Sequence, residues 1–109
     1  MTIPNKFKYK GYVWKVLTEL DLHHDDGTKC HGICDTTARI IYLESSLPKS
    51  VKEATFIHEL FHVMVHESRV PENAALTEDI EDILADNFSD LLSQCFNIRW
   101  NNGKNSKSN

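Results

Sequence analysis

The chain has 109 residues, of which 40% are hydrophobic and 26% charged, and its formal net charge is −4. This length suits one domain with a single modest core, and the composition is typical of a globular protein. A negative balance with both signs spread along the chain argues against a nucleic-acid-binding surface. No window holds the roughly 20 apolar residues of a membrane span, so neither nucleic acid nor membrane is expected as a partner.

The cysteines argue against a secreted protein. Three of them, Cys30, Cys34 and Cys95, form an odd set in a short chain, whereas a disulfide framework needs pairs. The N-terminus also lacks the apolar run of a signal peptide. We therefore expect a cytoplasmic protein with reduced thiols. Cys30, His31 and Cys34 can also be read as half of a zinc knuckle, but no second Cys/His pair follows at the spacing of a zinc ribbon.

The first predicted element is a strand. From Phe7 to Leu20, aromatic residues and valines alternate with lysines, which predicts a half-buried strand that bends at Gly11. The polar loop DLHHDDGTK follows, and its Asp and Gly residues supply turn chemistry. His23 and His24, in this loop, are expected to be exposed.

The middle of the chain predicts a hairpin and then a helix. Residues Ile33–Cys34 and Arg39–Leu43 are expected to pair as antiparallel strands around a turn. Ser50 is a suitable N-cap for a helix over Val51–Glu67, which contains neither Pro nor Gly. The residues expected to face the core recur at helical spacing: Val51, Ala54, Ile57, Phe61, Met64 and Val65.

A second helix is predicted to begin after Thr77, a favourable N-cap, and to run to about Phe96. Two acidic residues follow the cap, where they favour the positive end of the helix dipole. The residues predicted to form its buried stripe are Ile80, Leu84, Phe88, Leu91 and Cys95. Residues 1–100 are expected to form a single domain, and residues 101–109, which include no apolar side chain, a disordered tail.

The sequence His58-Glu59-Leu60-Phe61-His62 is an HExxH motif inside the first predicted helix. Because residues four apart share a helix face, both imidazoles can reach one cation. Two neutral imidazoles suit Zn²⁺. Glu59, next to the first ligand, can accept a proton from a water on the same metal and later pass it to the leaving amine. A chance alignment of surface histidines is the plainer alternative.

A catalytic zinc site needs a third protein ligand. His66 continues the row of histidines but lies about 6 Å further along the helix axis than His62, at about 1.5 Å per residue. We therefore expect a carboxylate from the second helix, in which paired acids four apart could act as metal ligand and as partner of a ligand imidazole. A solvated acidic face is the alternative, and helical geometry places Asp82 nearly opposite the predicted stripe. The candidates are Glu78, Glu81, Asp82 and Asp86.

The segments IIYLESSLPKSVKEATFIHELFHVMVH and LTEDIEDILADNFSDLL resemble the ImmA/IrrE-like metallopeptidases, small phage-type gluzincins. The resemblance implies an α+β, zincin-like fold in which a small antiparallel sheet packs on the HExxH helix and a second helix bears the third ligand. It places Asp82 at the ligand position and Asp86 as its outer partner. The family has Glu where this chain has Asp82, so Glu78 stays the second choice. It also implies that Arg39–Leu43 forms the lip of a cleft and pairs with an extended peptide.

The expected function is that of a zinc-dependent metallopeptidase that hydrolyses peptide bonds through a metal-activated water, with Glu59 as general base. Its partner would be a peptide or protein substrate. The alternative is a non-catalytic zinc-binding module that serves regulation or interaction in a phage or mobile element.

Overall fold

Two strands at the N-terminus form a hairpin instead of the one bent strand that the sequence predicts. In the computed structural model, which describes the backbone of residues 2–68 and 77–95 and the side chains as far as Ser89, β1 (Lys6–Tyr9) pairs antiparallel with β2 (Tyr12–Glu19). Lys10 and Gly11 both have positive φ, at 50° and 86°. Two successive residues of this kind reverse the chain in a tight hairpin turn, which is why the prediction of a bend was wrong.

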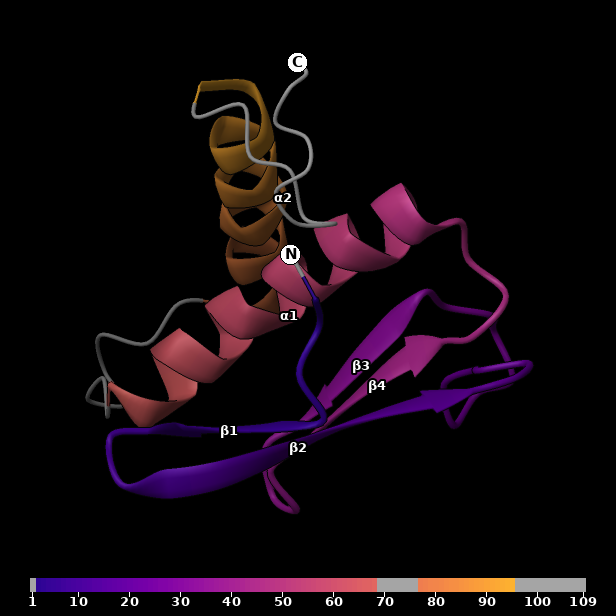
Figure 1. The fold of residues 1–109 in the computed structure, drawn as a ribbon, viewed down its shortest axis with the longest axis horizontal. Coiled ribbons are helices and arrows are strands. Elements are labelled where there is room, and N and C mark those ends of the chain that lie inside the picture. Colours follow the sequence, from indigo (N-terminus) through magenta and orange to yellow (C-terminus); the bar gives the residue numbers. More distant parts are fainter. Residues whose placement is uncertain (1, 69–76, 96–109) are drawn as a thin grey trace.

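The predicted second hairpin is confirmed, with β3 (Gly32–Asp35) antiparallel to β4 (Ile40–Glu44). The strand order is β1-β2-β4-β3, and β2 and β4 run parallel, so the sheet is mixed and not antiparallel throughout (Figure 1). This order overturns the expectation that Arg39–Leu43 forms the lip of a cleft. β4 is central: Ile41 lies opposite Val16 on one side and Cys34 on the other. The two edge strands are β1 and β3.

Helix α1 (Lys49–Glu67) crosses one face of the sheet (Figure 1). The buried hydrophobic cluster between them holds Trp14, Val16, Ile41, Leu43, Phe56 and Val63. The helix begins earlier than predicted, because the amide of Lys52 already donates to the carbonyl of Pro48 at 2.9 Å. Pro48 is therefore the N-cap, with no side-chain hydrogen bond, and the prediction of Ser50 as the cap was wrong.

The buried face of α1 differs from the predicted one. Of the six residues expected in the core, only Ile57 is buried, and Val51 and Met64 are 37% and 39% exposed. The face on the sheet instead includes three glutamates, Glu53, Glu59 and Glu67. A hydrophobic pattern does not predict this face. Glu67, for example, is buried together with its hydrogen-bond partners Trp14 and Arg39, which are distant in sequence.

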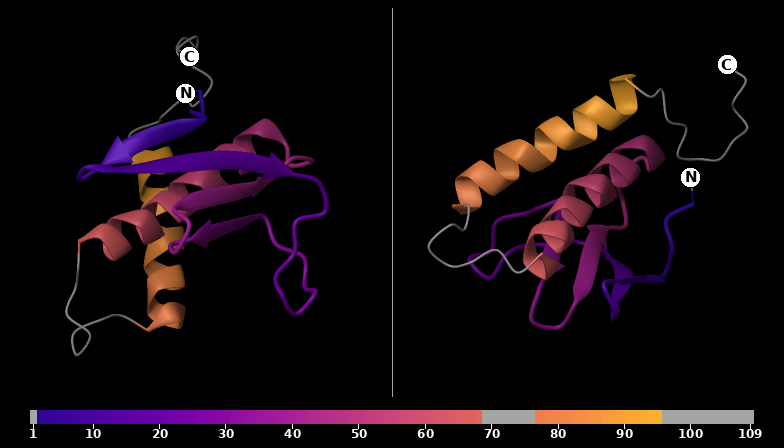
Figure 2. Two further views of the ribbon diagram at one scale, coloured as in Figure 1. Left: turned by 90° about the horizontal axis from the view of Figure 1, so that it is seen from below. Right: turned by 90° about the vertical axis from the view of Figure 1, so that its left-hand side faces the viewer.

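Helix α2 (Glu78–Cys95) packs on the side of α1 away from the sheet, which gives three layers (Figure 2). The predicted cap is confirmed: the amide of Ile80 donates to Thr77 Oγ1 at 3.2 Å. The predicted buried stripe is wrong, since Ile80, Leu84 and Phe88 are 47%, 39% and 36% exposed, whereas Ala85 is fully buried.

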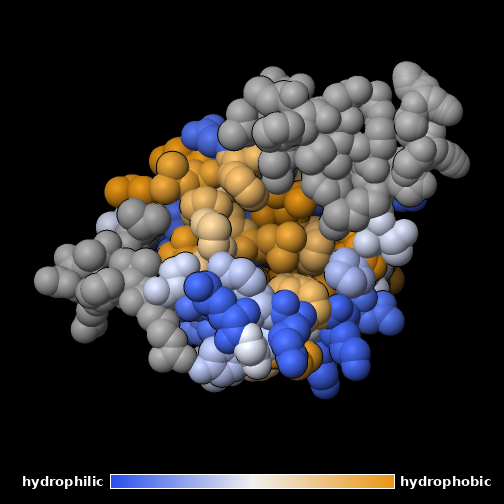
Figure 3. Space-filling view, turned by 60° about the vertical axis from the view of Figure 1, so that its left-hand side comes forward, coloured by the Kyte–Doolittle hydropathy of each residue, from blue (hydrophilic) through white to orange (hydrophobic). Residues whose placement is uncertain are grey.

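Hydrophobic residues accordingly gather over the two helices on the face in Figure 3, above a hydrophilic band. α2 thus turns its polar side inward, toward α1. The side chains of Leu91 and Cys95, and the predicted tail 101–109, lie outside the described residues. The predicted α+β class is confirmed. In the described part of the chain, no helix combines the length and apolar character needed to cross a membrane.

Candidate metal centre

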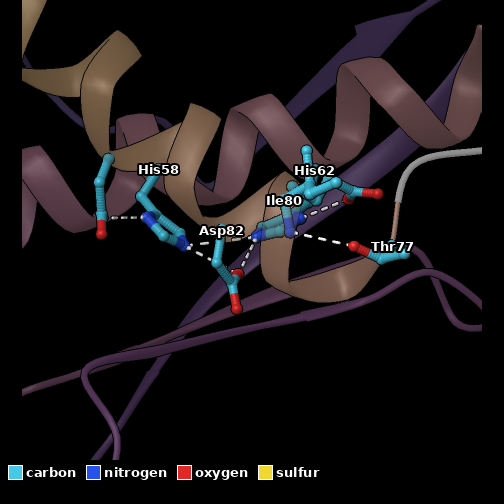
Figure 4. Close-up of polar contacts among 7 residues, drawn as sticks. His58, His62, Thr77, Ile80 and Asp82 are labelled. Carbon is cyan, nitrogen blue, oxygen red and sulfur yellow. Dashed lines mark hydrogen bonds and ion pairs between the residues drawn. The ribbon is translucent and has the colours of Figure 1, made fainter.

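The two histidines of the HExxH motif point to one place between α1 and α2 (Figure 4). Their ring centroids are 5.1 Å apart, and the two Nε2 atoms approach to 3.3 Å. A regular helix turn brings residues four apart to this spacing, as the sequence predicts. Both side chains are partly buried, with exposed fractions of 21% for His58 and 15% for His62.

Asp82 reaches the same point from α2. Its Oδ1 lies 3.1 Å from Nε2 of His62 and 3.6 Å from Nε2 of His58. Among the described residues, these three form the one group whose potential ligand atoms lie close enough to share a metal ion. Of the two acids that the sequence favours as third ligand, the structure thus brings the first into the cluster. The second, Glu78, is exposed and lines the same cavity as the cluster, but it is not a member of the metal-ligand group.

Two further carboxylates form hydrogen bonds with Nδ1 of the two imidazoles, on the side of each ring away from the cluster. Nδ1 of His58 donates to Asp86 Oδ1 at 2.8 Å, and Nδ1 of His62 donates to Glu81 Oε1 at 2.6 Å. Such outer partners fix the tautomer and the orientation of ligand imidazoles. The role of Asp86 agrees with the i, i+4 pairing that the sequence suggests. Glu81, a candidate ligand by sequence, instead contacts His62. Which of these acids contacts His62 Nδ1 depends on how α2 crosses α1, and the spacing of residues in the sequence does not predict that crossing.

The donor set fits a small divalent cation. Because each Nδ1 faces a carboxylate, two neutral imidazoles would direct their Nε2 lone pairs toward each other and toward Asp82. Three such electron-rich atoms are stabilised by a positive charge between them, which a proton or a metal ion can supply. Tetrahedral ligands at about 2.0–2.1 Å from zinc are separated by about 3.3–3.4 Å. The three observed separations of 3.1, 3.3 and 3.6 Å bracket that value.

The motif glutamate, Glu59, is buried beside this cluster, with only 6% of its surface exposed. A Cβ placed on Gly32 would lie 3.0 Å from Glu59 Oε2, so β3 approaches the carboxylate closely where it has no side chain. Burial raises the pKa of Glu59, although the nearby His58 and His62 act in the opposite direction. The sequence thus places a carboxylate of increased basicity next to the candidate metal ligands.

Two adjoining cavities meet at this carboxylate. One, of about 720 Å³, contains the whole His58, His62 and Asp82 cluster, and the other, of about 520 Å³, extends toward the start of α1. Glu59 and Gly32 line both. Together they make a groove between edge strand β3 and helix α2, with α1 beneath it.

Three other residues that the sequence analysis singled out, Cys30, Cys34 and His24, lie near this groove. Cys30 and Cys34 are free thiols, as predicted, and neither belongs to the metal-ligand group found among the described residues. Cys34 lines the larger cavity, and burial raises its pKa well above the ordinary thiol value. His24 is exposed, as predicted, but it also lines the larger cavity, a position that no sequence pattern predicts.

Comparisons with protein-family models, with curated proteins and with solved structures found no match.

Proposed function

We propose that His58, His62 and Asp82 bind a zinc ion and that the protein is a zinc-dependent metallopeptidase. The observation that carries the proposal is the convergence of three potential ligand atoms at 3.1–3.6 Å, with two further carboxylates bound to the imidazoles and a buried glutamate beside them. The resemblance of both helices to ImmA/IrrE-like peptidases supports the same assignment.

When bound, zinc supplies Lewis acidity, which polarises a peptide carbonyl and acidifies a water. Glu59 then acts as general base: its carboxylate accepts the proton of the attacking water and passes it to the nitrogen of the leaving amine. Burial favours this role, because the raised pKa of Glu59 increases its affinity for a proton at neutral pH. Asp86 and Glu81 keep the two imidazoles oriented throughout.

We further propose that an extended peptide substrate lies along β3, in place of the strand Arg39–Leu43 that the sequence suggested. Among the strands that the structure describes, β3 pairs with β4 alone, so we expect its other edge to offer main-chain hydrogen bonds. Gly32, Ile33 and Cys34, all on β3, line the cavity that contains the candidate ligands. This geometry favours recognition of the peptide backbone over recognition of one particular side chain.

A non-catalytic zinc-binding interaction module remains the second candidate function. The exposed apolar residues of α2 favour it, because Ile80, Ile83 and Leu84 are 47%, 59% and 39% exposed. Exposed apolar patches often mark protein contacts.

A Glu59→Gln variant separates the two functions. Loaded with zinc and assayed on labelled casein, it should retain one metal per chain and lose at least about a hundredfold in kcat. Glu53→Gln is the matched control, since Glu53 is an equally buried glutamate of α1 outside the groove, and its activity should stay near wild type. Equal turnover by zinc-loaded Glu59→Gln and wild type would contradict the proposed role of Glu59, whereas zinc binding without any wild-type activity would favour the interaction module.

A further inference from the structure

The loop between β2 and β3 is a small, well-bonded hairpin. His23 and Lys29 form a β-bridge, the amide of His24 donates to the carbonyl of Thr28 at 2.8 Å, and the amide of Gly27 donates to the carbonyl of His24 at 2.9 Å. At its tip the carboxylate of Asp26 accepts from the amide of Thr28 at 2.9 Å. These bonds fix the backbone of His24 on both sides.

This hairpin presents His24 to the candidate metal centre. His24 lines the same cavity of about 720 Å³ as His58, His62 and Asp82.

We propose that His24 is a further catalytic residue, which donates a hydrogen bond to the oxygen of the scissile carbonyl as negative charge develops there. This inference rests on the proposed peptidase function. In the reacting geometry the carbonyl carbon gains a bond to the water oxygen, the carbonyl electron pair moves onto its oxygen, and Glu59 takes the water proton. A donor aimed at that oxygen stabilises the transition state more than the ground state.

Among the described side chains that line this cavity, His24 is an imidazole that can donate an N–H hydrogen bond to a substrate oxygen. The carboxylates of Glu59, Glu78, Glu81, Asp82 and Asp86 accept when ionised and cannot donate. His58 and His62 have their Nδ1 protons committed to carboxylates. Cys34 offers only a weak thiol donor. Thr36 is a neutral hydroxyl, and His31 lines the smaller cavity, which contains neither His62 nor Asp82.

The test uses the zinc-loaded full chain and an N-phosphoryl dipeptide, phosphoryl-Leu-Ala, whose tetrahedral, anionic phosphorus group mimics the reacting carbonyl. Affinity is measured by calorimetry for wild type, His24→Ala and His23→Ala, alongside zinc content and casein turnover. His23 is the matched control on the same hairpin, exposed, and engaged with the carbonyl oxygen of Asp21 through Nδ1 at 2.7 Å.

We expect His24→Ala to bind zinc normally, to bind the phosphoryl dipeptide at least about tenfold more weakly and to lose about a hundredfold in kcat. His23→Ala should match wild type in all three. Unchanged affinity in His24→Ala, an equal loss in His23→Ala, or no binding by zinc-loaded wild type would overturn the inference. Failure of wild type to bind zinc would instead overturn the proposed function itself.

Discussion

At the scale of single residues, the centre depends on carboxylates that hold imidazoles in place. His58 and His62 each face Asp82 through Nε2 and an outer acid through Nδ1. The outer acids restrict each ring to one tautomer and one orientation. Substitutions of the outer acids can therefore measure what imidazole orientation contributes to metal affinity, separately from the contribution of the ligand atoms.

Replacing either outer acid should weaken zinc binding without abolishing it. We expect Asp86→Asn and Glu81→Gln each to reduce zinc affinity about 10- to 100-fold, because the imidazoles lose a charged acceptor. Competition titration with a zinc chelator dye measures this directly. Asp79→Asn, an exposed acid of the same helix and not a member of the cluster, is the control. If Asp79→Asn weakened binding as much as the two outer-acid variants, general electrostatics and not imidazole orientation would explain the effect.

At the scale of elements, the sequence predicted several local features, although it missed the hairpin turn at Gly11 and the N-cap of α1, and it failed where the outcome depends on packing between elements. The HExxH spacing, the Thr77 cap and the β3–β4 hairpin follow from residues close in sequence, and the structure contains all three. The central position of β4 and the exposed stripe of α2 depend on strand order and on how α2 crosses α1. The same dependence explains why Glu81 contacts His62.

The contact between α1 and β3 provides a test at this scale. A Cβ on Gly32 would lie 2.7 Å from Thr55 Cγ2 and 3.0 Å from Glu59 Oε2. Gly32→Ala should therefore destabilise the protein by about 1–3 kcal/mol, as overpacking does, and should displace the general base and reduce turnover. Urea unfolding and casein turnover are the measurements.

A double variant separates these two effects. Thr55→Ser removes the clashing methyl group but leaves the contact with Glu59, so in the Gly32→Ala background it should restore part of the stability and little of the activity. Wild-type stability in Gly32→Ala alone would show that β3 and α1 do not approach this closely.

At the scale of the whole molecule, one buried carboxylate links three parts of the fold. Glu67, at the end of α1, accepts from Trp14 Nε1 of β2 at 2.8 Å and from Arg39 Nε, just before β4, at 2.7 Å. The guanidinium of Arg39 also lies over the ring of Tyr12, 3.8 Å from its centroid. The end of the HExxH helix is thereby fixed to the sheet.

This link makes the stability of the fold depend on pH. The hydrogen bond from Arg39, opposed by burial and assisted by Trp14, lowers the pKa of Glu67 below its ordinary value of 4.5. Because the folded pKa is the lower one, the stabilisation is present above about pH 4.5 and is lost as pH falls through the folded pKa. Urea midpoints of wild type and Glu67→Gln should differ at pH 7 and converge as pH falls below 4.5. A difference that grew on acidification would contradict the assignment.

Zinc affinity tests the central claim most directly. Purified chain, titrated with zinc and measured by native mass spectrometry and chelator competition, should bind one ion per chain. His58→Ala and His62→Ala should each lose that ion, Asp82→Ala should bind it much more weakly than Glu78→Ala, and Glu59→Gln should keep it. Wild type that binds no zinc, or His58→Ala and His62→Ala variants that bind it as tightly as wild type, would contradict the account.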